Sequence, residues 1–135
     1  MKKSLFLMGF LLLSLSSFGQ KKLVIVADGI SEIKGSLMVV VFNSDSTFLK
    51  KPVFATKANI HADTEEVVTS LPEGEYAIFI FQDANENGKM DTREFGIPIE
   101  KYGFSNNVVG KMGPPSFKET CFALKKDMVM RITLR

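Results

Sequence analysis

The sequence has few of the residues on which catalytic and disulfide-rich domains rely. Among 135 residues it has one cysteine, Cys121, and one histidine, His61. A single cysteine cannot form an internal disulfide, so a small domain must be stabilised by its core or by a metal. A nucleophile needs a base within reach and the base needs an orienting group, and the chain contains neither G-x-S-x-G nor H-E-x-x-H. The sequence therefore predicts a non-enzymatic protein, and a small hydrolase has the weakest support.

The chain also lacks an excess of charge and an apolar stretch long enough to span a membrane. The formal net charge is +2, and Lys2 and Lys3 supply both units, so residues 20–135 are formally neutral. Nucleic-acid binding needs clustered Lys and Arg to neutralise phosphates, which excludes that class. The apolar stretch at residues 5–15 has roughly half of the ~20 residues that a transmembrane helix needs, and no second long stretch follows.

The N-terminus has the pattern of a secretory signal peptide. Two lysines precede the apolar stretch, and Ser16, Ser17, Phe18 and Gly19 follow it, as small residues do before a cleavage site. We predict cleavage between Gly19 and Gln20, which divides the chain into a signal peptide, residues 1–19, and one domain, residues 20–135. The product is predicted to be exported, to the periplasm or the cell exterior, with no membrane span after cleavage.

Short apolar stretches rich in β-branched and aromatic residues recur along the predicted domain, separated by turn residues, and no segment has a sustained helical period. This pattern predicts an all-β fold, a single immunoglobulin-like β-sandwich of about seven strands with a long irregular metal-loop excursion. A small open barrel is the alternative. The predicted strands lie within residues 23–26, 37–42, 53–60, 66–71, 76–81, 120–124 and 128–134.

Two of these stretches carry further information. Residues 128–134 alternate between two faces, one of them wholly apolar, which predicts a strand packed on one side only. Residues 76–81 are apolar on both faces, so this strand should be central. Tyr76 opens it directly after a turn, where a tyrosine in a sandwich often hydrogen-bonds back to the backbone. We therefore predict that the buried Tyr76 hydroxyl holds this turn.

Residues 82–116 have hardly any strand pattern, and a stretch of this length without regular structure tends to be functional. Its first part fits D-x-[DN]-x-[DN]-G-x5-E at every specified position. In this pattern alternate residues turn oxygens toward one point, the glycine permits a sharp bend, and a backbone carbonyl adds a ligand. The predicted metal ligands are Asp83, Asn85, Asn87, the carbonyl of Lys89, Asp91 and Glu94.

Hard oxygen ligands suit Ca²⁺ and leave no soft ligand for zinc or copper. The sequence therefore predicts a structural calcium ion that stabilises the loop. A helix-loop-helix hand is not expected, because the preceding residues 76–81 are predicted to form a strand. The alternative is an ordinary turn at Asn87 and Gly88 without a metal.

Three motifs in a fixed order give the chain a family resemblance. They are LPEGEYA at residues 71–77, DANENGKMD at residues 83–91, and GIP at residues 96–98 followed by YGFSNN at residues 102–107. With these motifs the chain resembles the small secreted bacterial proteins of the domain-of-unknown-function family DUF2141, frequent in Bacteroidetes-type bacteria. The resemblance implies an immunoglobulin- or transthyretin-like sandwich and no established activity. Lys101 replaces an expected glycine, and the family demands no acid at Glu94, so a carbonyl or water could close the metal site instead.

Tyr102, Phe104, Asn106 and Asn107 combine flat rings with amides, side chains that can stack on and hydrogen-bond a sugar or a peptide. In the other interpretation the rings plug the end of the sandwich and the amides cap turns. The predicted function is a binding or accessory module of the cell envelope that recognises an unknown glycan, peptide or envelope protein. A purely structural or assembly sandwich without a ligand pocket is the alternative.

Overall fold

The computed structural model describes residues 19–94 and 98–135, so the predicted signal peptide lies outside the described residues except for Gly19. A four-residue helix, α1 (Phe117–Thr120), and a 3-10 turn, η3 (Ser105–Asn107), interrupt an otherwise all-strand order. No helix in the described ranges is long and apolar enough to cross a membrane. The strands are β1 (Lys21–Asp28), β2 (Ser36–Phe42), β3 (Phe54–Asn59), β4 (Glu65–Leu71), β5 (Gly74–Asp83), β6 (Tyr102–Phe104), β7 (Phe122–Leu124) and β8 (Met128–Thr133).

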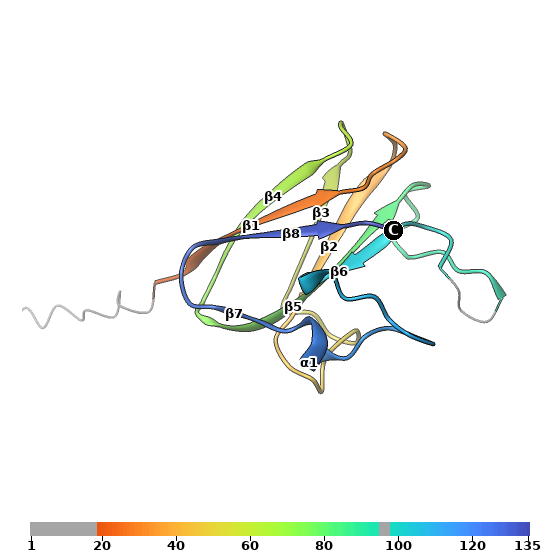
Figure 1. The fold of residues 1–135 in the computed structure, drawn as a ribbon. Coiled ribbons are helices and arrows are strands. Elements are labelled where there is room, and N and C mark those ends of the chain that lie inside the picture. The colour runs from red at the N-terminus through yellow and green to blue at the C-terminus, as the bar shows by residue number, and fades with distance from the viewer. Residues whose placement is uncertain (1–18, 95–97) are drawn as a thin grey trace, which may run out of the picture.

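The strands form two sheets, which Figure 1 shows from the side of β1 and β8. In the three-stranded sheet β1 is central, antiparallel to β4 and parallel to β8. The five-stranded sheet has the order β3-β2-β5-β6, and β7 pairs with the first residues of β5. The prediction of an all-β sandwich is confirmed.

The core lies between the two sheets and is mainly aliphatic. In β8, Met130 and Ile132 face the core while Val129 is 63% exposed, which confirms the predicted one-sided packing. Burying each aliphatic side chain of this kind stabilises the fold by about 1.5 to 3 kcal/mol. The side chains at its centre are Leu23, Ile25, Leu37, Val39, Val41, Ile78, Ile80, Leu124 and Ile132.

The other face of the five-stranded sheet carries aromatic rings. Phe79 of β5 packs against Phe104 of β6, with ring centroids 4.9 Å apart. Phe48, from the segment after β2, packs against Phe42, Phe104 and Phe117. Strand β5 is therefore covered on both faces, as its sequence predicts, by aliphatic side chains on one side and rings on the other.

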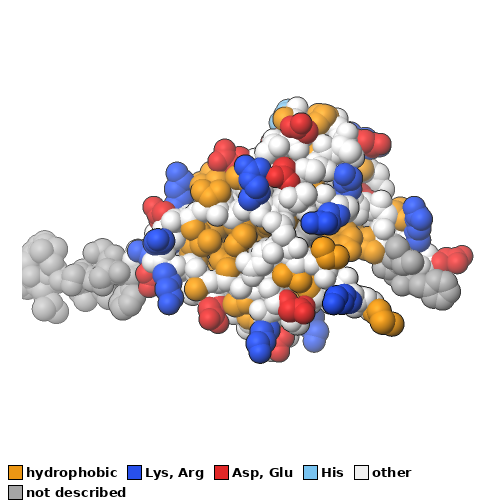
Figure 2. All heavy atoms as spheres, in the orientation of Figure 1, with side chains coloured by type: hydrophobic (Ala, Val, Ile, Leu, Met, Phe, Trp, Pro, Cys, Tyr) orange, Lys and Arg blue, Asp and Glu red, His pale blue; other side chains and the backbone are white. Residues whose placement is uncertain are grey.

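The outer face of the three-stranded sheet is partly apolar. Val24 of β1 pairs with Val68 of β4 on one side and with Val129 of β8 on the other. Val68 is 58% exposed. In Figure 2 hydrophobic side chains gather on the side of this sheet, surrounded by charged side chains.

The structure corrects the predicted strand at residues 120–124. Thr120 is the last residue of α1, and only Phe122–Leu124 forms strand β7. The helix begins with a capping box: the Ser116 hydroxyl accepts from the backbone N–H of Glu119 at 3.2 Å, and the Glu119 carboxylate accepts from the backbone N–H of Ser116 at 2.9 Å. These paired bonds favour one helical turn despite the β-branched Thr120.

Strand β6 is an eighth strand that the sequence did not predict. It has three residues with Gly103 in the middle, which weakens any strand pattern. A Cβ on Gly103 would lie 2.8 Å from Cγ2 of Ile132 and 2.9 Å from the carbonyl oxygen of Thr133. Glycine thus lets β6 approach β8, and Tyr102 and Arg135 exchange two backbone hydrogen bonds that link the two sheets at this edge.

Candidate metal loop and adjoining pocket

Tyr76 fixes the start of β5, the strand that leads into the candidate loop. Its side chain is buried, and its hydroxyl donates to the carbonyl oxygen of Pro72 at 2.7 Å, which confirms the predicted corner. Burial raises the pKa of Tyr76 above its ordinary value. The corner lies near the start of β5, and Asp83, the last residue of the strand, enters the loop at its other end.

Asp83 organises the first turn of the loop. It is 1% exposed, and its carboxylate accepts from the backbone N–H groups of Asn87 at 3.1 Å and Gly88 at 2.7 Å. Gly88 has a φ of +78°, a left-handed conformation that glycine adopts without strain. The predicted first ligand thus lies at the centre of a sharp bend, and the predicted glycine forms that bend.

The side chains of Asp83, Asn85, Asn87 and Asp91 form a polar ring. The Asn85 amide nitrogen donates to one carboxylate oxygen of Asp91 at 2.6 Å, and the Asn87 amide nitrogen donates to the other at 2.7 Å. The backbone N–H of Asn87 is shared between two acceptors. One is the amide oxygen of Asn85 at 3.3 Å, and the other is the Asp83 carboxylate. The structure therefore brings Asp83, Asn85, Asn87 and Asp91 together.

The other two predicted ligands are placed differently. The Lys89 backbone lies next to the ring, because its N–H donates to the amide oxygen of Asn87 at 3.1 Å. Glu94 is exposed and has no hydrogen bond to another described residue. Within residues 19–94 and 98–135, no three His, Cys, Asp or Glu side chains are gathered closely enough to hold a metal. Asp83, Asp91 and Glu94 therefore do not meet, and the ring offers two carboxylates and two amides.

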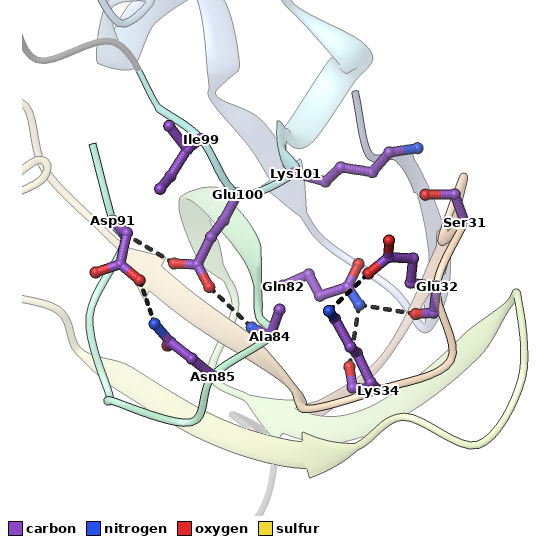
Figure 3. A pocket seen from close by; sticks show the side chains of 10 residues that line it. All are labelled: Ser31, Glu32, Lys34, Gln82, Ala84, Asn85, Asp91, Ile99, Glu100 and Lys101. Atoms are coloured by element: carbon purple, nitrogen blue, oxygen red, sulfur yellow. Dashed lines mark hydrogen bonds and ion pairs between the residues drawn. The ribbon is translucent and has the colours of Figure 1, made fainter. Parts of the chain in front are cut away.

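Glu100 is a residue of this site that the sequence pattern missed. Its carboxylate accepts from the backbone N–H of Ala84 at 2.8 Å and from the backbone N–H of Asp91 at 2.8 Å. As Figure 3 shows, Glu100 thereby ties the two sides of the loop together. It lies beyond the pattern from Asp83 to Glu94, and a lone acid after Ile99 gives no local sign of this role.

A cavity of about 450 Å³ lies beside the ring (Figure 3). Asn85 and Asp91 belong both to the ring and to the cavity lining, and Glu100 and Lys101 extend the same side. The connection between β1 and β2, residues 29–35, contributes further polar lining, and Gln82 of β5 lies between the two sides. The loop is therefore one wall of a polar pocket.

The predicted ligand-binding rings lie away from this pocket. Tyr102 and Phe104 line a second cavity of only about 30 Å³ together with Asn107. Phe104 is buried and belongs to the aromatic cluster on β5. Tyr102 is half-buried beside it, with ring centroids 6.1 Å apart.

The two predicted amides bond to the backbone of neighbouring elements. The Asn106 side chain donates to the carbonyl oxygen of Cys121 at 3.0 Å. The Asn107 amide oxygen accepts from the backbone N–H of Thr133 at 2.9 Å. Both residues have positive φ angles, 62° and 54°. These contacts agree with the interpretation in which the two amides cap turns.

Cys121 and His61 do not line the pocket beside the loop. Cys121 is half-buried, and burial, followed by the nearby Glu75 carboxylate, raises the pKa of its thiol. A raised pKa lowers the thiolate fraction, and the thiolate is the nucleophile. His61 is exposed, and its backbone N–H donates to Glu65.

Comparisons with known proteins place the chain in a family rather than give it an activity. A family profile described as "Uncharacterized protein conserved in bacteria (DUF2141)" matches residues 25–132, a range that includes the ring, Glu100 and the cavity beside them. No curated protein and no solved structure was found to match the chain.

Proposed function

The chain belongs to DUF2141, a bacterial family without a characterised function, and we propose that it is an exported, non-enzymatic binding or accessory module of the cell envelope with a structural calcium ion in its loop. The observation that supports this proposal most is the ring of Asp83, Asn85, Asn87 and Asp91. The cavity beside the ring favours binding over a purely structural role.

The donor set of the ring fits Ca²⁺. Two carboxylates and two amides supply hard oxygen ligands, and the neighbouring Lys89 carbonyl is a fifth candidate. Both amide nitrogens now face the Asp91 carboxylate, which is the position that a cation would favour. Turning each amide about its last bond exchanges nitrogen for oxygen and presents an oxygen there. The exchange would also turn each NH₂ group toward a backbone N–H, that of Asn87 or that of Lys89, so these two donors would need other acceptors.

The proposed role of the ion is to stabilise the loop. Asp83 and Glu100 already set the backbone through four N–H groups, so the ion would add stability to a formed turn. A strand, β5, precedes the loop, and the described residues around it include no pair of helices that could open as they do in calcium sensors. Extracellular calcium modules of this type bind with dissociation constants on the order of 10⁻⁴ to 10⁻³ M.

The test is thermal unfolding of chelator-stripped protein. With a dissociation constant on the order of 10⁻⁴ M, about 1 mM calcium should stabilise the fold by about 1.4 kcal/mol and raise the melting temperature by roughly 4 to 8 °C. Asp91→Ala should abolish most of the rise by removing an anionic ligand, and magnesium should produce much less of it. Glu94→Ala is the matched control if a carbonyl or water closes the site. Identical melting curves with calcium and with chelator would refute the proposed ion.

Export and the absence of catalysis rest on separate observations. The basic and apolar pattern of residues 1–19 supports export. Export is tested by the intact mass of the protein recovered from the periplasm or medium. We expect the mass of a chain that begins at Gln20. The raised pKa of Cys121, which lowers the fraction of reactive thiolate, supports a non-enzymatic role.

A further inference from the structure

We propose that the cavity between the ring and residues 29–35 binds an acidic sugar unit, a hydroxylated ring that carries a carboxylate. This inference rests on the proposed calcium site, because the ion would share Asn85 and Asp91 with the cavity wall. Its evidence is the fixed orientation of one buried amide, the position of two lysines, and the charge of the lining.

Gln82 presents a fixed hydrogen-bond acceptor to the cavity. The residue is 5% exposed, and its amide nitrogen donates to the carbonyl oxygens of Glu32 at 2.8 Å and Lys34 at 3.0 Å. These two bonds fix which way the amide points. Its Oε1 accepts no hydrogen bond from a described residue, yet among described residues no buried side-chain nitrogen or oxygen lacks a partner. Oε1 is therefore not fully buried, and in the cavity that Gln82 lines it is free to accept a hydrogen bond from a ligand hydroxyl.

Two ammonium groups are held at the same cavity. Lys101 Nζ donates to the carbonyl oxygen of Gly29 at 2.8 Å, and Lys34 Nζ lies 2.9 Å from a carboxylate oxygen of Glu32. An ammonium group has three donors, so each lysine keeps donors for a ligand. Because both side chains are already anchored to residues 29–34, less side-chain entropy is lost when they bind. Their chemistry favours a carboxylate.

The charge of the lining makes such binding dependent on calcium. The carboxylates of Glu32, Asp91 and Glu100 outnumber the ammonium groups of Lys34 and Lys101 by one, so the lining is formally negative and repels an anion. With the Asp83 carboxylate of the ring the formal charge is −2, so a bound Ca²⁺ would cancel it and remove the repulsion. The ring offers five ligand groups, and if each binds through one oxygen they are fewer than the six to eight oxygens that Ca²⁺ usually takes, so sugar oxygens could complete its shell.

The polarity of the cavity favours a sugar over a peptide. Ile99, 52% exposed, is the one large apolar side chain among the described residues that line it. A peptide would leave its apolar side chains without a matching pocket, whereas a sugar presents hydroxyls all around its ring. The volume of about 450 Å³ lies in the range of small-ligand sites.

The experiment follows backbone amide NMR signals of the ¹⁵N-labelled exported protein during a titration with methyl α-D-glucuronide. With calcium, shifts are expected at residues 31–34, 82–85 and 99–101, and chelator should weaken binding about tenfold or more because the lining becomes repulsive. Methyl α-D-glucoside, which lacks the carboxylate, should produce no comparable shifts. Lys101→Gln should weaken glucuronide binding, and Lys50→Gln, an exposed lysine after β2, is the control. Gln82→Met removes the Oε1 acceptor and should also weaken glucuronide binding. If Gln82→Met does not fold, Lys101→Gln still tests the proposed site.

Each outcome decides one proposal. If calcium raises the melting temperature but glucuronide causes no shifts, the ion stands and the sugar assignment is wrong. Equal shifts with N-acetylglycine, a compact carboxylate of peptide type, would also overturn it. If calcium leaves the melting temperature unchanged, the proposed ion is refuted. Glucuronide binding that is equally strong in chelator would overturn the calcium dependence.

Discussion

Strand β5 is held by different forces at its two ends. Near its start the Tyr76 hydroxyl makes a single hydrogen bond to Pro72 within a largely apolar setting. At its end Asp83 begins a loop that carboxylates and amides hold, several of them in contact with solvent. Buried hydrogen bonds respond little to salt or cations, while interactions of partly exposed charges respond strongly. Solution conditions should therefore act on one end of the strand and not on the other.

The largest effect is expected at Asp83. Asp83→Ala removes a buried carboxylate and leaves the N–H groups of Asn87 and Gly88 without their acceptor. Two hydrogen bonds to a charged group are worth about 3 to 5 kcal/mol together, and this loss should appear in denaturant unfolding. The calcium-dependent rise in melting temperature should disappear in the same variant. If Asp83→Ala lowered the free energy of unfolding by less than Tyr76→Phe does, the loop end of β5 would not be the more strongly held end.

Tyr76→Phe should cost about 1 to 3 kcal/mol, because the Pro72 carbonyl loses its donor. The loss should be the same with calcium and with chelator, since the two ends of β5 respond to different forces. Denaturant midpoints measured in both conditions provide the test. Coincident midpoints for the variant and the parent would show that the corner bond contributes nothing.

Glu100→Gln sharpens the comparison within the loop. The substitution keeps the shape of the side chain but turns one acceptor into an NH₂ group that faces the N–H of Ala84 or Asp91. We expect a loss of about 1 to 2 kcal/mol. Hydrogen exchange of these two amides should accelerate, while exchange at residues 76–80 should stay slow. Uniform acceleration along β5 would mean that the loop and the strand unfold together.

Alkaline pH gives a milder test of the Tyr76 end. The pKa of Tyr76 is raised by burial, so its neutral form is favoured in the folded state. Its contribution to stability is fully present below the unfolded tyrosine pKa of about 10 and is lost as pH rises through the higher folded pKa. Unfolding free energies measured across this window should fall more steeply for the parent than for Tyr76→Phe. Equal slopes would contradict this linkage.

The smallest effect is expected at Glu94. Glu94→Gln should change stability by less than about 0.5 kcal/mol, because the side chain is exposed and bonds to no other described residue. Glu86 is a poorer control, since its carboxylate accepts from the hydroxyl of the buried Ser36 at 2.9 Å. A clear loss of calcium stabilisation in Glu94→Gln would show that Glu94, the last predicted ligand of the loop, moves to the ion.

Features that depend on neighbouring residues could be predicted from the sequence. The β-branched stretches predicted most strands, and the turn before Tyr76 predicted its hydrogen bond. The pattern from Asp83 to Asp91 predicted which side chains converge, because alternate residues of a tight bend must point inward.

Features that depend on distant residues could not be predicted in the same way. Glu100 reaches Ala84, and Gln82 reaches residues 32–34, through contacts that no local pattern encodes. Strand β6 exists because Gly103 permits close approach to β8, a tertiary cause that opposes its own weak strand propensity. The capping box at Ser116 and Glu119 was readable in principle, but one helical turn leaves no apolar period.

The parallel pairing of β1 with β8 has a mechanical consequence. The two strands pair from Leu23 with Met128 to Asp28 with Thr133, and they run in the same direction. Tension applied before β1 and after β8 therefore pulls them along their length in opposite directions. In this shear geometry the hydrogen bonds of the ladder, together with those between Tyr102 and Arg135, carry the load at once rather than in succession. Force on the chain must therefore break the hydrogen bonds between β1 and β8 before the core opens.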